Sequence, residues 1–527
     1  MDQLVLVFVI LFATILAEPL ADRLGVASAV LMTLFGGAVA LIPATPNIHI
    51  PPDLILPLVL PPLLYAAARR TSWRQFAENW GPIALRAFGL VIATTAAVAA
   101  VFHAWYPGLP IAAAIALGAL VAPPDPVAAT AMASKLGLPR RLVVVLGGEG
   151  LFNDVTAIVV YGVAIQAVVT GRFSAWHAMG EFLLSAVVAI VVGLVLGWAG
   201  SKLTRYLAQP TLQVALSLLL PFAAYGLADY WSGSAVLAVL VCALYLTDAA
   251  TDFGDSGYRL VGDSFWEITE MLLSGFAFGL IGLELGVVLE ESNDDRPRLL
   301  ACTAVVVATV VGVRLIWLLS TWAIGRSWFR RRDADEPYTW RETIVTWWAG
   351  MRGVATVALA LAIPFTTDAG RNFPGRSEIL FIAFVVVLFT LLLQGPTLPL
   401  VVTLTGVQAD TKHEREVERQ LWERVVRAEL NRLKQLAAEE DLPDEVYEQL
   451  RDRFRYRLDR ADPQAADAEA KAQAERDLRS AKKIREIRNE VLEAGRREAL
   501  AARHEAGMPP DVVDRVTRRL DLGSAWR

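Results

Sequence analysis

The sequence is poor in the residues that build disulfides, zinc sites and most nucleophilic centres. It contains two cysteines and five histidines in 527 residues. Cys242 and Cys302 lie in separate apolar stretches without partners at a metal-ligand spacing, so neither a disulfide framework nor a zinc site is expected. No His-Glu-x-x-His motif occurs, which excludes a zinc protease of that type. We therefore expect no cofactor.

Charge is scarce in most of the chain and dense in the rest. Of the first 407 residues 50 are charged, about 12%, against 53 of the last 120, about 44%. A region that faces lipid and a region that faces water cannot share one core. We therefore expect a membrane domain over 1–407 and a water-exposed helical tail over 408–527. The net charge is −5, and neither part is basic enough to indicate a nucleic-acid partner.

Long apolar runs dominate the first 407 residues. No basic residue precedes the first run, which is therefore expected to stay as a helix and not to be cleaved as a signal peptide. A bilayer core needs roughly 20 apolar residues per helix, and the runs predict an all-α polytopic fold with thirteen transmembrane helices. They lie near 3–20, 25–43, 53–68, 81–104, 109–133, 142–170, 177–204, 211–229, 232–248, 265–290, 299–325, 342–364 and 378–405.

Loop charges predict the orientation. An odd number of spans puts the two termini on opposite sides of the bilayer. With the N-terminus outside, the inner loops and their edges carry fifteen Lys and Arg residues and the outer loops five. The positive-inside rule therefore predicts a multi-pass protein of the cell membrane with a cytoplasmic C-terminal tail.

Six ionisable residues within the predicted spans need an explanation, because an ionisable side chain at mid-bilayer costs at least about 2.5 kcal/mol and needs a partner or a water-filled cavity. Arg86 is near the inner end of its span and is expected to snorkel. Arg314 is expected to pair with Glu284 or Glu149, or to line a water-filled funnel that opens to the cytoplasmic side. The six are Arg86, Arg314, Arg352, Asp125, Glu149 and Asp154.

The fifth span is predicted to break in mid-membrane. It reads Ala122-Pro123-Pro124-Asp125-Pro126, and prolines remove backbone donors and clash with the preceding turn. Irregular backbone at this depth must line a cavity or be buried in protein. Asp125 would then lie beside freed carbonyls, which suits a small cation. The alternative is a proline kink with an incidentally solvated acid.

The sixth span adds a second carboxylate. Glu149 and Asn153 are four residues apart and share a helix face, whereas Asp154 is turned about 140° from Glu149 and can point toward Asp125. Carboxylate and amide oxygens without a Cys/His cluster suit Na⁺, another alkali cation or a proton. We therefore expect a monovalent cation to bind at Asp125 and Asp154, with Asn153 beside them.

The twelfth span contains an arginine between two glycines, Gly350 and Gly353, which weaken a helix at mid-depth. If spans four to six and eleven to thirteen are inverted repeats, Asp125 and Arg352 occupy the matching centres of two crossed broken helices. Such crossings form the midplane ion site of many secondary transporters. The match between the repeats is positional only.

Five motifs occur in an order that resembles one transporter family. The chain is similar to prokaryotic NhaP-type sodium/proton antiporters of the monovalent cation:proton antiporter-1 family, over essentially all of 1–407. The motifs are Leu60-Pro61-Pro62-Leu63-Leu64-Tyr65, Asp125-Pro126, Glu149 with Asn153-Asp154, Gly282-Leu283-Glu284-Leu285, and Gly350-Met351-Arg352-Gly353.

The resemblance implies a homodimer in the lipid bilayer. Its core bundle, mainly 81–170 and 299–405, would move as an elevator against a dimerisation part, mainly 1–68 and 177–290. It also implies that no enzymatic reaction takes place.

The resemblance further assigns roles to site residues. Asp154 would carry the cation or the proton, and Asp125 would lie at the unwound crossing. Asn153 beside Asp154 implies electroneutral one-for-one exchange. Glu149 and Arg352 would form a buried structural ion pair.

Three positions depart from the family pattern and shape the expected site. Ala66 replaces a frequent glutamate, Pro124 a threonine and Gly150 a serine. Each change removes an oxygen ligand, so K⁺/H⁺ antiport is an alternative to Na⁺/H⁺ antiport. A cation channel is a further alternative because broken helices also line pores. An intramembrane aspartyl protease is disfavoured because Leu-Phe-Asn, and not Gly-x-Gly, precedes Asp154.

Overall fold

The computed structural model describes residues 2–24, 27–42, 52–69, 80–125, 136–171, 175–252, 256–291, 296–328, 339–407, 411–440, 447–448 and 451. In these ranges the regular structure is helical apart from one isolated bridge between Thr366 and Asn372. The chain separates into two compact units, residues 1–409 and 410–527.

The first unit contains α-helices and two π-helical segments, η1 and η3, which continue neighbouring α-helices. Their bounds are α1 (Asp2–Leu24), α2 (Ser28–Ala40), α3 (Pro52–Arg69), α5 (Trp80–Ala84), η1 (Leu85–Leu90), α6 (Val91–Trp105), α7 (Ile111–Val121), α9 (Arg140–Thr170), α10 (Ala175–Tyr206), α11 (Pro210–Tyr230), α12 (Ala235–Asp252), α13 (Ser256–Glu291), α14 (Arg296–Trp328), α15 (Trp340–Trp348), α16 (Val354–Leu361), α17 (Arg376–Phe389), η3 (Thr390–Gln394) and α18 (Gly395–Thr405).

Apolar helices of membrane-spanning length make up much of this unit. Among the described residues, eight helical stretches are long and apolar enough to cross a bilayer, and four shorter apolar helices accompany them. Helices occupy most of the described residues in the ranges in which the sequence predicts spans, and residues 126–133 of the fifth predicted span lie outside the described part of the chain. The multi-pass helical class is therefore confirmed, whereas the count of thirteen crossings and the inverted repeats stay predictions.

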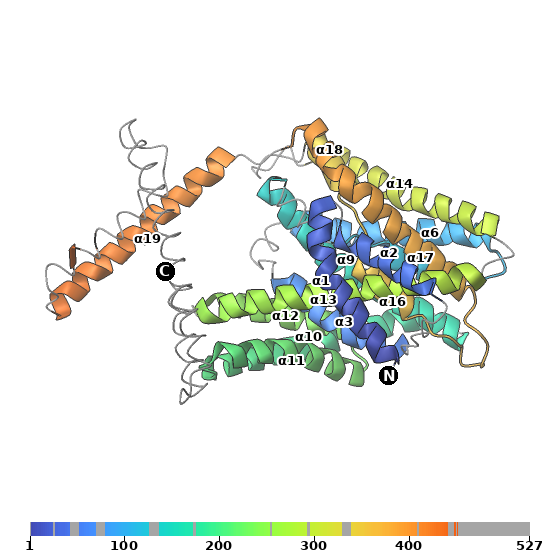
Figure 1. Ribbon diagram of the computed structural model, residues 1–527, viewed down its shortest axis with the longest axis horizontal. Helices are drawn as coiled ribbons and strands as arrows, with labels where there is room; N and C mark the ends of the chain where they lie inside the picture. The colour runs from blue at the N-terminus through green and yellow to red at the C-terminus, as the bar shows by residue number, and fades with distance from the viewer. Residues whose placement is uncertain are drawn as a thin grey trace, which may run out of the picture. The chain divides into compact units, whose positions relative to one another are not determined.

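Groups of adjacent helices organise the first unit (Figure 1). Helices α10, α11 and α12 pack against one another, and elsewhere in the unit α14 contacts both α6 and α17. Helices α2 and α13 cross closely because glycines face each other: a Cβ at Gly36 would overlap the Gly279 carbonyl, and one at Gly282 would overlap the Thr33 carbonyl. Small residues allow such close backbone approach between membrane helices.

The second unit contains α19 (Thr411–Glu440), a long and mostly polar helix. Its apolar residues include Val426 and Leu433, which are buried. The rest of the predicted helical tail, after residue 440, falls almost entirely outside the described residues.

Candidate functional site

The first break lies at the end of α7. This helix stops at Val121, and residues 122–125 are not helical. Pro123 and Pro124 explain the end of the helix because they cannot donate backbone hydrogen bonds. Residues 126–135 lie outside the described part of the chain, so the structure places Asp125 at the end of a described segment.

The second break lies between α15 and α16. Residues 349–353 are not helical, and both glycines in this segment are required by their surroundings. A Cβ at Gly350 would overlap the Arg314 side chain, and a Cβ at Gly353 would overlap the Asp125 carboxylate. The two glycines thus weaken the helix, as predicted, and they also leave room for the side chains of Arg314 and Asp125.

The structure brings the two breaks together, as the sequence predicts. The Asp125 backbone N–H donates to the Met351 carbonyl at 2.6 Å. In the opposite direction, Arg352 Nε donates to the Val121 carbonyl at 3.1 Å and its Nη2 to the Ala122 carbonyl at 3.4 Å. Each break therefore supplies hydrogen-bond partners for the other.

The charges at this crossing oppose the helix dipoles. The Asp125 carboxylate lies against Gly353, the residue that caps the N-terminus of α16. The Arg352 guanidinium lies at the C-terminal ends of α7 and α15, where it also donates to the Gly350 carbonyl. Anions are favoured at helix N-termini and cations at C-termini, so both side chains are electrostatically matched to their positions.

Each break is also held by a polar side chain from a helix that follows it in the chain. Asn153 Nδ2 on α9 donates to the Pro124 carbonyl at 3.3 Å. Thr390 Oγ1 accepts from the Arg352 backbone N–H at 3.1 Å. Thr390 begins the π-helical segment η3, a distortion that is frequent at functional sites. Sequence reasoning missed Thr390 because it is one hydroxyl in an apolar run.

The second carboxylate, Asp154, lies on α9 next to this crossing. It is partly buried and within electrostatic range of Asp125. Asn153 is fully buried, and its Oδ1 has no hydrogen-bond partner among the described residues. Gly150 is four residues before Asp154 and shares its helix face, so no side chain from that position crowds the carboxylate. Carboxylate and amide oxygens thus gather at one place.

The predicted ion pair between Glu149 and Arg352 is wrong. Glu149 Oε1 instead accepts from Arg314 Nη1 at 2.5 Å, and its Oε2 lies 3.7 Å from Arg86 Nη1. The reason is geometric: Arg314 reaches Glu149 through the space that Gly350 leaves, whereas the Arg352 side chain folds back onto backbone carbonyls. Of the two partners predicted for Arg314, Glu149 is confirmed, and the Glu284 side chain lies outside the described residues.

Arg86 does not snorkel as predicted. It is 9% exposed and lies in η1, from which its guanidinium extends toward Glu149 on α9. One buried carboxylate therefore faces two buried arginines.

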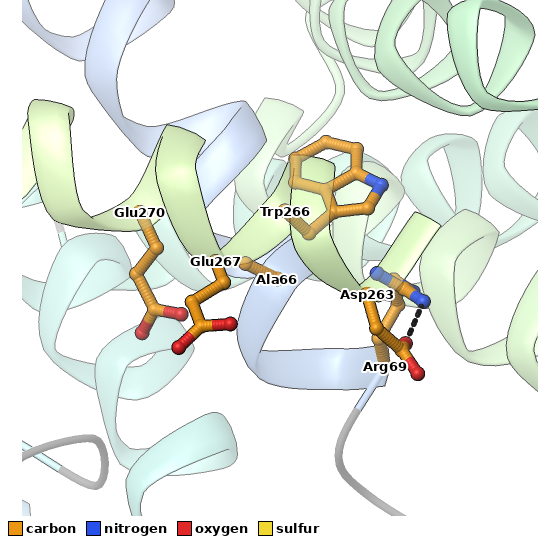
Figure 2. A pocket seen from close by; sticks show the side chains of 6 residues that line it. All are labelled: Ala66, Arg69, Asp263, Trp266, Glu267 and Glu270. Carbon is orange, nitrogen blue, oxygen red and sulfur yellow. Dashed lines mark hydrogen bonds and ion pairs between the residues drawn. The ribbon is translucent and has the colours of Figure 1, made fainter. Parts of the chain in front are cut away.

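A cavity of about 280 Å³ lies between the end of α3 and the first half of α13 (Figure 2). Asp263, Glu267 and Glu270 are spaced so that they share one face of α13. Arg69 closes one side, where its Nη2 contacts Asp263 Oδ1 at 2.6 Å. Glu270 is 7% exposed. The cavity is lined by Ala66, Arg69, Asp263, Trp266, Glu267 and Glu270.

Ala66 on α3 lines this cavity. It is the position at which the resemblance leads one to expect a glutamate, and its methyl group faces the cavity that Glu267 and Glu270 line from α13 (Figure 2). The carboxylates near this position thus come from α13 and not from α3. The sequence signal for them is the helical spacing of Asp263, Glu267 and Glu270.

The sequence matches the family described as "Sodium/hydrogen exchanger, transmembrane" over residues 7–404. An uncharacterised Na⁺/H⁺ exchanger of Mycobacterium tuberculosis is 33% identical over 526 residues, which cover 98% of this chain and 95% of the relative. The Na⁺/H⁺ antiporter ApNhaP of Aphanothece halophytica is 30% identical, with 70% of this chain and 68% of that protein covered.

A solved structure shares the fold. The sodium proton antiporter MjNhaP1 of Methanocaldococcus jannaschii superposes with a TM-score of 0.59 at 19% identity, and the match covers 76% of this chain and 99% of that one. The family match spans the two helix breaks and the cluster of Asp125, Asn153 and Asp154. The chain therefore belongs to the sodium/hydrogen exchanger family.

Proposed function

We propose that the chain exchanges a monovalent cation, Na⁺ in the first instance, for H⁺, with both ions competing for Asp154 beside Asp125. The observation that carries this proposal is the crossing itself, where the Asp125 N–H donates to the Met351 carbonyl while Asp154 and the unpartnered Asn153 Oδ1 lie next to it. These are hard oxygen ligands, which suit an alkali cation.

The distribution of charge supports Asp154 as the carrier. Glu149 is neutralised by Arg314 and Arg86. Asp125 lies at the N-terminus of α16, where a negative charge is stabilised by the helix dipole. No described residue donates a hydrogen bond to the Asp154 side chain, and Asp125 repels its negative charge. Asp154 is thus the carboxylate whose charge a bound ion must compensate.

This arrangement leads to coupled exchange. With a proton or a cation bound, Asp154 contributes no net charge to the crossing. An empty site would carry an uncompensated carboxylate through an apolar barrier, which is costly. Only loaded sites then cross, and one proton is exchanged for one monovalent cation in an electroneutral cycle.

The movement is an elevator in this proposal. A core formed mainly by 81–170 and 299–405 would slide against a dimerisation part formed mainly by 1–68 and 177–290 in a homodimer. The close glycine contacts of α2 with α13 support a rigid dimerisation part. The N-terminus would lie outside and the tail in the cytoplasm.

K⁺/H⁺ exchange is the second candidate. Pro124 and Gly150 supply no side-chain oxygen near Asp154, and a site with fewer fixed ligands discriminates less between alkali cations. A Bacillus subtilis relative, 29% identical, is named as a sodium, potassium, lithium and rubidium/H⁺ antiporter. Titration of each cation separates the two candidates.

Proteoliposomes that contain a pH-sensitive dye provide the test. An inward Na⁺ or K⁺ gradient should drive proton efflux without net current. Asp154→Asn should abolish this flux, whereas Asp229→Asn, an exposed aspartate near the end of α11, should not. Flux that persists in Asp154→Asn contradicts the proposal, and a net current carried by one cation alone indicates a channel.

A further inference from the structure

The Arg352 guanidinium occupies a place that the carbonyls of two broken helices create. Its Nε donates to Val121, its Nη2 to Ala122 and its Nη1 to Gly350. The side chain is 1% exposed, so these hydrogen bonds form away from water. All three acceptors are main-chain oxygens.

These oxygens are of the type that unwound helices offer to transported cations. Val121 and Ala122 end α7, and Gly350 follows the end of α15. Both helices therefore direct the negative ends of their dipoles at one point. Carbonyl groups that a broken helix leaves without a helical partner need another hydrogen-bond donor or a cation at membrane depth. Here the positively charged Arg352 side chain is that partner.

The backbone of Arg352 is also held in place. Thr390 Oγ1 accepts the Arg352 backbone N–H at 3.1 Å, and Gly353 allows the Asp125 carboxylate to approach on the other side. Glu149, which the family resemblance pairs with Arg352, forms its ion pair with Arg314 instead. The Arg352 guanidinium thus forms its hydrogen bonds with the main-chain carbonyls.

We propose that Arg352 is a tethered substitute for a second alkali cation. Its guanidinium fills a carbonyl-lined site that would otherwise bind Na⁺ or K⁺, and it thereby confines the transported cation to Asp154 and Asp125. This inference rests on the proposed function for its meaning in the transport cycle. Its physical content, a latent alkali-cation site at Val121, Ala122 and Gly350, can be tested without transport.

The test uses thermal unfolding of the purified full chain in detergent. All variants carry Asp154→Asn, so that the transport site does not contribute to cation binding. Arg352→Ala frees the carbonyls and leaves room for an ion. Arg352→Met frees them but fills the space, and Arg352→Lys keeps a charge there. Each variant is measured as choline chloride is replaced by NaCl or KCl at constant ionic strength.

The unfolding temperature of Arg352→Ala should rise by several degrees and saturate with Na⁺ or K⁺, because a ligand that binds only the folded state stabilises it. The unfolding temperatures of Arg352→Met and Arg352→Lys should stay flat. A flat response of Arg352→Ala, or an equal rise in Arg352→Met, overturns the proposal.

Failure to fold is also informative. An alkali cation should replace the guanidinium, so Arg352→Ala should be recovered as monodisperse protein in NaCl or KCl and poorly in choline chloride. Its loss in all three salts counts against the latent site. Proton exchange by the unsubstituted chain is measured separately, so a failure of the proposed antiport is distinguishable from a failure of this inference.

Discussion

Arg314 on α14 donates from Nη1 to Glu149 Oε1 on α9 at 2.5 Å, and both side chains are at least 98% buried. The same arginine donates from Nη2 to the Thr346 carbonyl on α15 at 3.2 Å. One side chain thus ties three helices together beside the second break. We expect this contact to be structural, since neither residue belongs to the cluster of Asp125, Asn153 and Asp154.

Replacement of Glu149 by glutamine should destabilise the protein strongly. It leaves Arg314 and Arg86 buried without their counter-ion, and removal of one partner from such a pair costs about 3–5 kcal/mol. Thermal unfolding in detergent measures the loss. The control is Asp263→Asn, which removes a pair whose aspartate is 74% exposed and should change stability by less than about 1 kcal/mol. Equal effects of the two substitutions would refute the structural role of Glu149.

Replacement of Gly353 by alanine should abolish exchange. The added methyl group overlaps the Asp125 carboxylate, so either the carboxylate or the second break must move. Gly312→Ala is the matched control because a Cβ at Gly312, within α14, meets no atom within 4 Å, and alanine favours a helix over glycine by about 1 kcal/mol. Proton flux in proteoliposomes distinguishes them, and normal flux in Gly353→Ala would count against the crossing as the site.

Replacement of Thr390 by valine should lower the maximal exchange rate. Valine has the shape of threonine but leaves the Arg352 backbone N–H without its acceptor, at a cost of about 1–3 kcal/mol for a buried donor. Thr390→Ser keeps the hydroxyl and should recover most of the rate. Thr403→Val, whose hydroxyl bonds only within its own helix, controls for the loss of a hydroxyl. Recovery by serine is the decisive comparison, since a purely steric role would not show it.

The pH dependence should show competition at one site. When the pH falls, more of Asp154 is protonated, so the apparent KM for the cation should rise while the maximal rate at saturating cation stays the same. The sign follows from mutual exclusion of H⁺ and cation at one carboxylate. Initial rates over a grid of pH and cation concentration provide the measurement. A fall in maximal rate with unchanged KM would place the proton elsewhere.

A glutamine substitution in the cavity should weaken cation capture at low salt. The cavity is lined by three carboxylates and one arginine, and because Arg69 pairs with Asp263, the excess negative charge of Glu267 and Glu270 attracts cations. Glu267→Gln should raise the apparent KM, and this effect should shrink as ionic strength increases because the Glu267 side chain is exposed and salt screens exposed charge. A salt-independent change would point instead to direct coordination or to misfolding.

The sequence predicted local features well where one residue type restricts the backbone. The prolines around Asp125 and the glycines around Arg352 predicted the two breaks, because both residue types weaken a helical backbone through local chemistry. The pairing of buried charges was predicted less well. Arg352 and Arg314 are both arginines deep in apolar runs, and nothing in their local sequence tells which one reaches Glu149.

By itself, the sequence determined the division into an apolar helical domain and a charged tail, the places where helices break, and the family. These follow from composition and local backbone chemistry, which act over a few residues. Only the tertiary structure decided that Glu149 binds Arg314 and Arg86, that Arg352 binds the carbonyls of both breaks, and that Glu267 and Glu270 lie beside Ala66. A side chain pairs with the group that packing brings within hydrogen-bond distance, and that distance depends on how helices far apart in the chain cross.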